Sequence, residues 1–246
     1  MRAIWLAKKV ARGYEMREVA YSEGKWNTLR ALRHKAITVM ESLGSRGIDS
    51  IVHGSLARGD VSARSDIDIL IPQPILSLNL ESALSGAGYS VAKREVTQAT
   101  PLHVVKGIIH ISEELKVTFP LMPLRGRERD FYRFGGETDL EGLKAGRRVP
   151  GVDKRLMLII PTAAGHVEFS VLDNVVEAAR IIGVKVETIM ERVRVLKRRD
   201  EVGRTGIYWK EELSESESFE GALKERSSKD PSLRRLLQRR GCGLKY

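Results

Sequence analysis

The feature that constrains this chain most is a short stretch, residues 66–71, in which acidic and aliphatic residues alternate before an apolar end. Successive side chains of a β-strand leave opposite faces. The pattern therefore predicts a strand whose isoleucines enter a core while Asp66 and Asp68 share the other face. Two neighbouring carboxylates supply the hard oxygen ligands that suit Mg²⁺. The same acid-x-acid spacing occurs at residues 128/130, 139/141 and 215/217, so the spacing alone does not identify a site.

A glycine-serine turn precedes this strand and gives the two aspartates a context. A strand candidate ends at His53, Gly54 and Ser55 follow, and ten residues separate Ser55 from Asp66. Glycine lets backbone N–H groups approach an anion, and the serine hydroxyl adds a donor. We therefore expect a turn that contacts the phosphates of a nucleoside triphosphate, beside two carboxylates that hold the metal ion bridging those phosphates.

Two motifs, GSLARG at residues 54–59 and SDIDI at residues 65–69, resemble the signature of the DNA polymerase β-like nucleotidyltransferase superfamily in its minimal form. The run from FYRFGG to RVPGVDKRLMLIIPT, within residues 131–162, looks like uncharacterised archaeal members. The resemblance implies an α+β fold, a mixed sheet flanked by helices. It also implies transfer of a nucleoside monophosphate from an NTP to an acceptor hydroxyl, with Mg²⁺ or Mn²⁺ as cofactor.

The resemblance also assigns roles to individual residues. It implies that Asp66 and Asp68 are catalytic metal ligands and that Gly54 and Ser55 bind the triphosphate. Two further residues, Arg58 and Ser65, are candidates for phosphate contact; a surface charge and a strand-entry cap are their alternative roles.

The family usually supplies a third carboxylate from a later strand. The strand expected at residues 115–121 has Lys116 in its interior and only Glu114 at its edge. Glu168, at the centre of a half-buried strand, is the favoured third metal ligand and catalytic residue. Glu114, Glu95 or no third ligand remain alternatives, and the last would leave a site that binds nucleotide without turning it over.

Hydrophobic periodicity predicts the remaining elements of the chain. We expect helices at residues 22–43 and 78–85, strands at 48–52 and 89–96, a strand pair at 107–111 and 115–121, and a hairpin at 155–160 and 166–172. These elements place the nucleotidyltransferase domain, with its N-terminal helical segment, at residues 1–172.

The part of the chain after residue 172 indicates a second module. Two helical stretches meet at Gly183, a spacing that resembles a helix-turn-helix. The turn Gly-Arg-Thr-Gly at 203–206 lies between strand-like pieces, as in a wing. The sequence thus predicts a winged-helix domain at 173–210 and a charged tail at 211–246. The basic residues expected to contact nucleic acid are Arg192, Arg194, Lys197, Arg198 and Arg199; packing or dimerisation is the alternative role of this module.

Composition favours a polyanionic partner. Lys and Arg number 42 against 32 Asp and Glu, a net charge of +10, which suits RNA or DNA. The Arg- and Gly-rich segment 124–148 could stack bases on its aromatics, although inward packing is favoured for Phe131 and Phe134. The acceptor is expected to be RNA or another nucleic acid. A small molecule or protein acceptor, or a nucleic-acid-binding regulator that senses nucleotide without catalysis, remain alternatives.

Other classes of protein are disfavoured. The single cysteine, Cys242, excludes an internal disulfide framework and a multi-cysteine metal site. The longest runs without charge, residues 69–80 and 156–167, are 12 residues long, too short for a membrane helix. The N-terminus has no signal-peptide core. The expectation is a cytoplasmic protein with no membrane partner.

Overall fold

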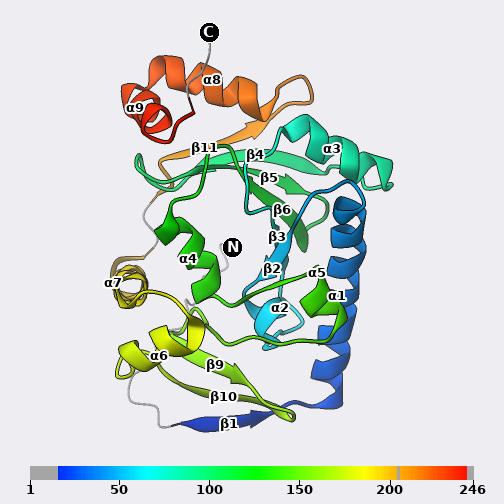
Figure 1. Cartoon of the computed structure of the whole chain (residues 1–246), viewed down its shortest axis with the longest axis vertical. Helices are drawn as coiled ribbons and strands as arrows, with labels where there is room; N and C mark the ends of the chain where they lie inside the picture. Colours follow the sequence, from blue (N-terminus) through cyan, green and yellow to red (C-terminus); the bar gives the residue numbers. More distant parts are fainter. Residues whose placement is uncertain (1–15, 204–205, 243–246) are drawn as a thin grey trace, which may run out of the picture.

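The computed structural model describes residues 16–203 and 206–242. Its longest helix, α1 (Glu23–Gly44), begins where Ser22 accepts a hydrogen bond from the Lys25 backbone N–H at 3.3 Å, as an N-cap residue does. Apolar residues at helical spacing, among them Leu29, Ala36 and Leu43, are buried. The helix runs along one side of the main sheet (Figure 1), and it confirms the helix predicted at residues 22–43.

The main sheet has seven strands in the order β11-β4-β5-β6-β3-β2-β7. The pair β3–β6 is parallel and the other five pairs are antiparallel, so the sheet is mixed, as expected for an α+β fold. Its strands are β2 (Ile51–His53), β3 (Ile67–Leu70), β4 (Lys93–Gln98), β5 (Val105–His110), β6 (Leu115–Pro120), β7 (Glu137–Asp139) and β11 (Trp209–Leu213).

The two faces of this sheet differ in polarity. Val52, Ile69 and Val117 lie side by side in the register and are fully buried. They share one hydrophobic core with α1 and α3 (Ser77–Gly86). Because side chains alternate along a strand, Asp68 and Lys116, which are also register partners, lie on the opposite face. Strand β3 thus buries Ile67 and Ile69 in the core and leaves Asp68 on the other face of the sheet.

A second, smaller sheet lies at the opposite end of the molecule from α8 and α9 (Figure 1). Its four antiparallel strands run in the order β1-β10-β9-β8. The hairpin of β9 and β10 confirms the hairpin predicted in this region. The strands are β1 (Arg17–Ala20), β8 (Gly151–Val152), β9 (Met157–Pro161) and β10 (Gly165–Ser170).

The helices α6 (Val175–Ile182) and α7 (Val186–Val202) pack on this small sheet. Leu158 and Phe169 from the strands form one buried cluster with Ala178 and Ile189 from the helices. A left-handed Gly183 joins the two helices, as the helix-turn-helix spacing predicts. The predicted boundary at residue 172 falls between the strands and the helices that share this cluster.

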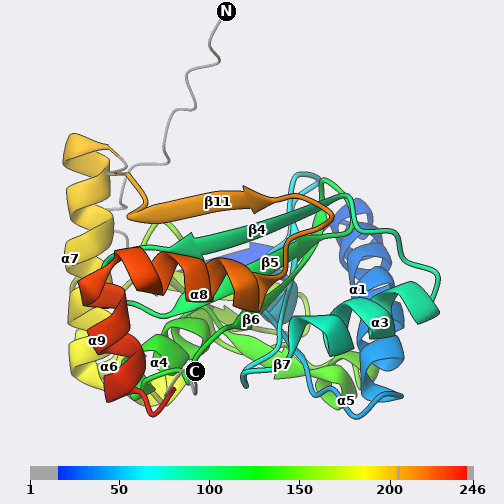
Figure 2. The same ribbon diagram turned by 90° about the horizontal axis from the view of Figure 1, so that it is seen from above.

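The predicted wing differs from the structure. Helix α7 continues to Val202, where the first strand-like piece was expected. The second piece is β11, which runs alongside β4 at the edge of the main sheet (Figure 2). Arg204 and Thr205 of the expected turn lie outside the described residues. The strand that would have formed half of a wing therefore belongs to the main sheet.

The predicted charged tail is a folded part of the core. Helices α8 (Phe219–Lys229) and α9 (Pro231–Arg239) follow β11. The Phe219 ring is fully buried and meets Phe119 of β6 edge-on, with 5.0 Å between ring centroids. Leu233 and Leu236 of α9 are also buried. Charged residues outnumber the apolar ones that recur at helical spacing in these two helices. Residues 243–246 lie outside the described part.

The Arg- and Gly-rich segment forms α4 (Gly126–Phe134), β7 and α5 (Leu140–Lys144). Phe134 is buried, which confirms its predicted inward packing. Phe131 is 38% exposed, so inward packing was wrong for this ring. The Arg192 guanidinium of α7 lies 4.7 Å from the Phe131 ring centroid and covers it instead. In the described part of the chain, no helix has the length and apolar character that crossing a bilayer requires.

Candidate active site

The glycine-serine turn follows β2 and is held rigidly. Gly54 has φ 77° and ψ −144°, a backbone conformation that favours glycine. Its N–H donates to the carbonyl of Gly136 at 2.9 Å. The short helix α2 (Ser55–Arg58) begins at the next residue. The buried Arg33 of α1 donates to the carbonyls of Leu56 and Ala57 at 3.0–3.1 Å. The turn is therefore fixed from two sides.

A contact between two serines brings this turn to the acidic strand. The hydroxyls of Ser55 and Ser65 lie 3.4 Å apart. Ser65 also accepts a hydrogen bond from the backbone N–H of Ser62 at 2.9 Å. Ser65 is the residue immediately before Asp66, so the hydroxyls and the first carboxylate lie in one region of the structure.

The two aspartates converge on one positive charge. Asp66 precedes β3 and is exposed, whereas Asp68 lies within the strand and is half-buried. The ammonium of Lys116, on β6, lies 2.8 Å from Asp68 Oδ1 and 3.9 Å from Asp66 Oδ2. The parallel register pairs Asp68 directly with Lys116. Both carboxylates therefore face a single point where the structure already places a cation.

The charges of this group shift its pKa values. Burial raises the pKa of Asp68, but nearby positive charges, the hydrogen-bonded Lys116 among them, outweigh burial and leave that pKa below its usual value. Burial likewise lowers the pKa of Lys116, and the attraction and hydrogen bond of Asp68 more than offset it, so this pKa is raised. Asp68 and Lys116 are therefore both charged at neutral pH.

Two further basic residues lie on the same face of the sheet. Burial lowers the pKa of His53, on β2, and that of Lys106, on β5. Asp68 is among the charges that act on both groups. The His53 ring also meets the Tyr132 ring edge-on, with centroids 5.0 Å apart. The aspartates thus face a surface that carries several basic groups.

Arg58, a candidate for phosphate contact, points into the protein. Its side chain is only 5% exposed. The guanidinium donates to the carbonyl of Gly135 at 2.6 Å and pairs with Asp60 at 2.9 Å. The structure therefore places the Arg58 guanidinium between the turn and the segment after α4, where both of these contacts are made within the protein.

Glu168, the favoured third ligand, lies in the small sheet on β10. Its carboxylate oxygens lie 2.6 Å from a nitrogen of Arg155, 3.5 Å from one of His166 and 3.6 Å from one of Arg17. Among the described residues, no three His, Cys, Asp or Glu side chains gather closely enough to hold a metal ion. The structure does not bring Glu168 to the two aspartates, because its strand belongs to a different sheet.

The other carboxylates considered for this role are also engaged elsewhere. Glu114 pairs with Lys35 of α1. Glu95, on β4, is buried and pairs with Lys210 at 3.0 Å and Lys93 at 3.4 Å. The position beside Asp68 in the register is thus held by Lys116, where a third acid would have completed a carboxylate cluster.

The basic residues of α7 divide into two groups. Arg194, Arg198 and Arg199 are exposed and Lys197 is partly exposed, so they can meet a partner. Burial lowers the pKa of Arg192 to about 10, and its guanidinium covers the Phe131 ring. Arg192 therefore packs α7 against α4, and the four other residues form the basic face of α7.

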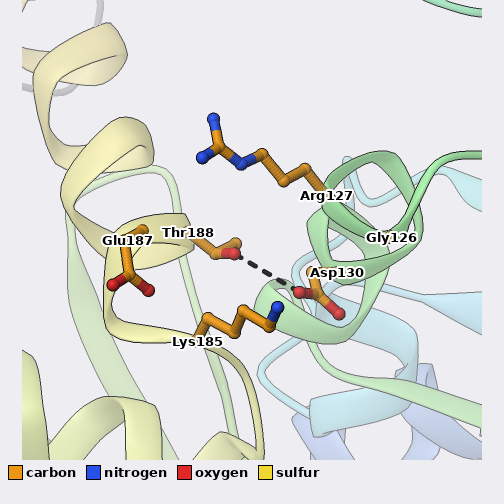
Figure 3. A pocket seen from close by; sticks show the side chains of 6 residues that line it. All are labelled: Gly126, Arg127, Asp130, Lys185, Glu187 and Thr188. Atoms are coloured by element: carbon orange, nitrogen blue, oxygen red, sulfur yellow. Dashed lines mark hydrogen bonds between the residues drawn. The ribbon is translucent and has the colours of Figure 1, made fainter.

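A cavity of about 300 Å³ opens between α4 and α7 (Figure 3). Thr188 and Asp130 approach each other across it, with 3.4 Å between Oγ1 and Oδ2. Its other lining residues are Gly126, Arg127, Lys185 and Glu187. Basic and acidic side chains both line this cavity. Neither the glycine-serine turn nor Asp66 and Asp68 contribute to it.

Sequence reasoning missed that Lys116 lies beside the two aspartates. The signal was a lone lysine inside the otherwise uncharged run L-K-V-T-F-P. A lysine in the middle of a mostly buried strand needs a charged partner; the parallel pairing of β6 with β3, which supplies it, is not readable from the sequence.

Comparisons with known proteins agree with this geometry. Residues 33–115 match the family model described as a nucleotidyltransferase domain. The matched segment contains the turn, the strand of the two aspartates and the start of β6. No curated protein and no solved structure matches the chain. Residues 33–115 therefore belong to the nucleotidyltransferase domain family, within the polymerase β-like superfamily.

Proposed function

We propose that the protein is a Mg²⁺- or Mn²⁺-dependent nucleotidyltransferase that moves a nucleoside monophosphate from an NTP to an acceptor hydroxyl. The observation that carries this proposal is the convergence of Asp66 and Asp68 on one cation. Ser55 and Ser65, whose hydroxyls lie 3.4 Å apart, stand at the entrance to the same strand. This combination suits a metal-bound triphosphate better than a free metal ion.

The donor set fits one divalent ion. Asp66 and Asp68 supply two carboxylates, and Mg²⁺ commonly takes one or two carboxylates with substrate phosphates completing its shell. When bound, the ion would offset the charge that develops on the phosphates during transfer. Ser55 and Ser65 would donate hydroxyl hydrogen bonds to phosphate oxygens. Lys106 and Lys116 would add positive charge on the same face.

The reaction is a single displacement at phosphorus. The acceptor oxygen forms a bond to the α-phosphorus, the bond from that phosphorus to the bridging oxygen breaks, and pyrophosphate leaves. The acceptor hydroxyl releases its proton to solvent water. The rigid Gly54–Gly136 contact supports this chemistry because it fixes the turn before substrate arrives, and positioning accounts for much of phosphoryl-transfer catalysis.

RNA or another nucleic acid is the acceptor that the charge distribution favours. The chain carries a net charge of +10. The basic face of α7 presents Arg194, Lys197, Arg198 and Arg199 without burying their side chains. A polyanion that binds such a face gains affinity through the release of its counterions.

The test is transfer of label from each of the four α-labelled NTPs to total RNA in the presence of Mg²⁺. Wild type should label RNA with at least one NTP. Asp66→Asn and Asp68→Asn should each abolish labelling, because an amide keeps the shape and loses the charge that holds the ion. Asp173→Asn, at an exposed position, is the matched control. Full activity of both active-site variants would refute the proposal.

A second candidate function is a nucleic-acid-binding regulator that senses nucleotide without transfer. Lys116 favours it, because a lysine stands where a third carboxylate would complete the metal site. In that case wild type would bind NTP and RNA but leave the RNA unlabelled. Labelling of a protein or small molecule in a cell extract, with none on RNA, would instead indicate the other acceptor classes.

A further inference from the structure

Lys116 contacts both aspartates of the proposed metal site, although nucleotidyl transfer itself does not require a lysine there. Its ammonium is within ion-pair distance of both aspartates. It occupies the region where a divalent ion shared by these carboxylates would bind. A free Mg²⁺ ion and the Lys116 ammonium therefore compete for the same oxygens.

We propose that Lys116 excludes free divalent cations from the Asp66–Asp68 site, so that the metal enters only together with the triphosphate. When the metal displaces the Lys116 ammonium from the carboxylates, the oxygens of the incoming phosphates form an ion pair with it. This inference rests on the proposed function, because it assumes that the site takes an NTP.

The partners left to the Lys116 ammonium in each case support this order of binding. Two carboxylates and one ammonium sum to a single negative charge in a half-buried site. A free divalent cation would turn that sum positive and would push the ammonium away without giving it a new partner. A metal–triphosphate complex carries net negative charge and brings oxygens that the ammonium can contact. Charges in a partly buried site interact more strongly than in water, so loss of a partner for the ammonium disfavours entry of the free ion.

Among the described residues around Lys116, no further unpaired carboxylate is available to its ammonium. Glu95, the further carboxylate whose charge acts on Lys116, is already paired with Lys93 and Lys210. His110 and Lys93 follow Lys116 across the next two strands in the register, and both are basic residues. Displaced from the aspartates, the ammonium would be left to solvent unless an anion from outside the protein binds it, since the Lys116 side chain is 31% exposed.

Lys106 adds to the preference for an anion. Burial lowers its pKa, and Asp68 and Glu128 are the acidic groups that act on it. Neither carboxylate forms an ion pair with it in the described part of the chain, since Asp68 pairs with Lys116 and Glu128 with Arg240. The same sheet face thus holds two ammonium groups for which triphosphate oxygens would be partners.

The test measures Mn²⁺ binding directly, from the electron paramagnetic resonance signal of the free ion. Wild type and Lys116→Gln are titrated with Mn²⁺ alone and with Mn²⁺ plus an α,β-methylene NTP that resists transfer. Removal of the ammonium should tighten the binding of Mn²⁺ alone by about tenfold or more, because the competing cation is lost. In wild type, tight Mn²⁺ binding should require the NTP analogue.

Three further variants sharpen this test. Lys210→Gln removes an equal charge from the same sheet, at Glu95 rather than at the aspartates, and should leave Mn²⁺ binding unchanged. Lys116→Arg keeps the charge and should keep the exclusion. The double variant Lys116→Gln/Asp68→Asn should not show the tighter Mn²⁺ binding of Lys116→Gln alone. Circular dichroism checks folding, and Lys116→Arg keeps the proposal testable if Lys116→Gln does not fold, because loss of exclusion in Lys116→Arg would contradict it.

Two results would overturn the inference: equal Mn²⁺ affinity of wild type and Lys116→Gln, or equally tight Mn²⁺ binding by wild type with and without the analogue. Either result, together with RNA labelling by wild type, would leave the proposed function intact. The expected Mn²⁺ behaviour without labelling of any acceptor would support the inference and remove the catalytic proposal.

Discussion

Arg240 donates two hydrogen bonds, 2.6 and 2.7 Å long, to the carboxylate of Glu128. Glu128 belongs to the first turn of α4 and also accepts the backbone N–H groups of Arg125 and Val104. The Arg240 side chain is only 2% exposed. This pair joins the end of the described chain to the helix that leads into β7 and the carbonyl that holds Gly54.

Replacing Arg240 with Met should lower the free energy of unfolding by about 3 kcal/mol, because removal of one partner of a buried pair leaves the other charge uncompensated. Urea unfolding followed by circular dichroism measures the change. Arg235→Met, at an exposed position of the same helix, is the control and should change stability by less than about 0.5 kcal/mol. Equal effects of the two variants would mean that the pair does not stabilise the fold.

The same pair predicts a dependence of stability on pH. Burial raises the pKa of Glu128, but the hydrogen bonds from Arg240 and from the backbone outweigh it and leave the pKa below its ordinary value. A carboxyl with a depressed pKa stabilises the native state above its unfolded pKa of about 4.3, and this stabilisation is lost as the pH falls through the native value. Urea midpoints measured from pH 6 down to pH 3 should therefore fall more steeply in wild type than in Glu128→Gln.

Phe219→Ala should destabilise the protein by about 3–5 kcal/mol, since it removes a fully buried ring. The ring packs on Phe119 and over Gly107, where an added Cβ would lie 2.9 Å from it. Denaturant unfolding of this variant beside Val176→Ala, which alters an exposed residue, isolates the effect of the core. A change as small as that of the control would indicate that α8 does not belong to the core.

Glu168→Gln should reduce stability by about 1–3 kcal/mol, because Arg155 and His166 lose a charged partner in a buried position. Its Mn²⁺ affinity in the presence of the NTP analogue should equal that of wild type. Asp68→Asn is the contrasting variant and should lose Mn²⁺ binding. Weaker Mn²⁺ binding by Glu168→Gln would contradict this prediction and indicate that Glu168 is a metal ligand.

Alanine at Lys197, Arg198 and Arg199 together should weaken RNA binding and flatten its salt dependence. Each phosphate contact contributes somewhat under one unit to the slope of log affinity against log salt, so the slope should fall by about two to three units. A matched loss of charge elsewhere, Lys224, Lys229 and Arg235 to Ala, should leave the slope unchanged. A change of mass in light scattering, with an unchanged slope, would instead assign these residues to self-association.

The sequence was informative where one short segment decides the structure. The helix α1, the strand of Asp66 and Asp68 and the hairpin of β9 and β10 follow from periodicity and turn residues. The convergence of Ser55 on Ser65 follows from a motif of fixed spacing. In these cases local preference and tertiary contacts favour the same conformation.

Predictions failed where distant segments meet. Pairing of β3 with β6 places Lys116 beside Asp68, and pairing of β11 with β4 takes a strand away from the expected wing. Neither choice of partner leaves a local pattern in the sequence. Glu168 showed the alternation expected of a site residue, yet its strand joined another sheet. Charge content also concealed the buried apolar residues of α8 and α9.

The pairing of β11 with β4 also has a consequence while the chain is being synthesised, because β4 is made long before its partner strand. Strand β4 ends at Gln98, and the partner that completes it begins only at Trp209. During synthesis β4 is therefore an open sheet edge, the kind of surface on which nascent chains join one another. Charged side chains on an open edge oppose such pairing, and Lys93, Arg94 and Glu95 supply them. Lys93 and Glu95, which later pair with Glu212 and Lys210 of β11, thus oppose aggregation of the unfinished chain.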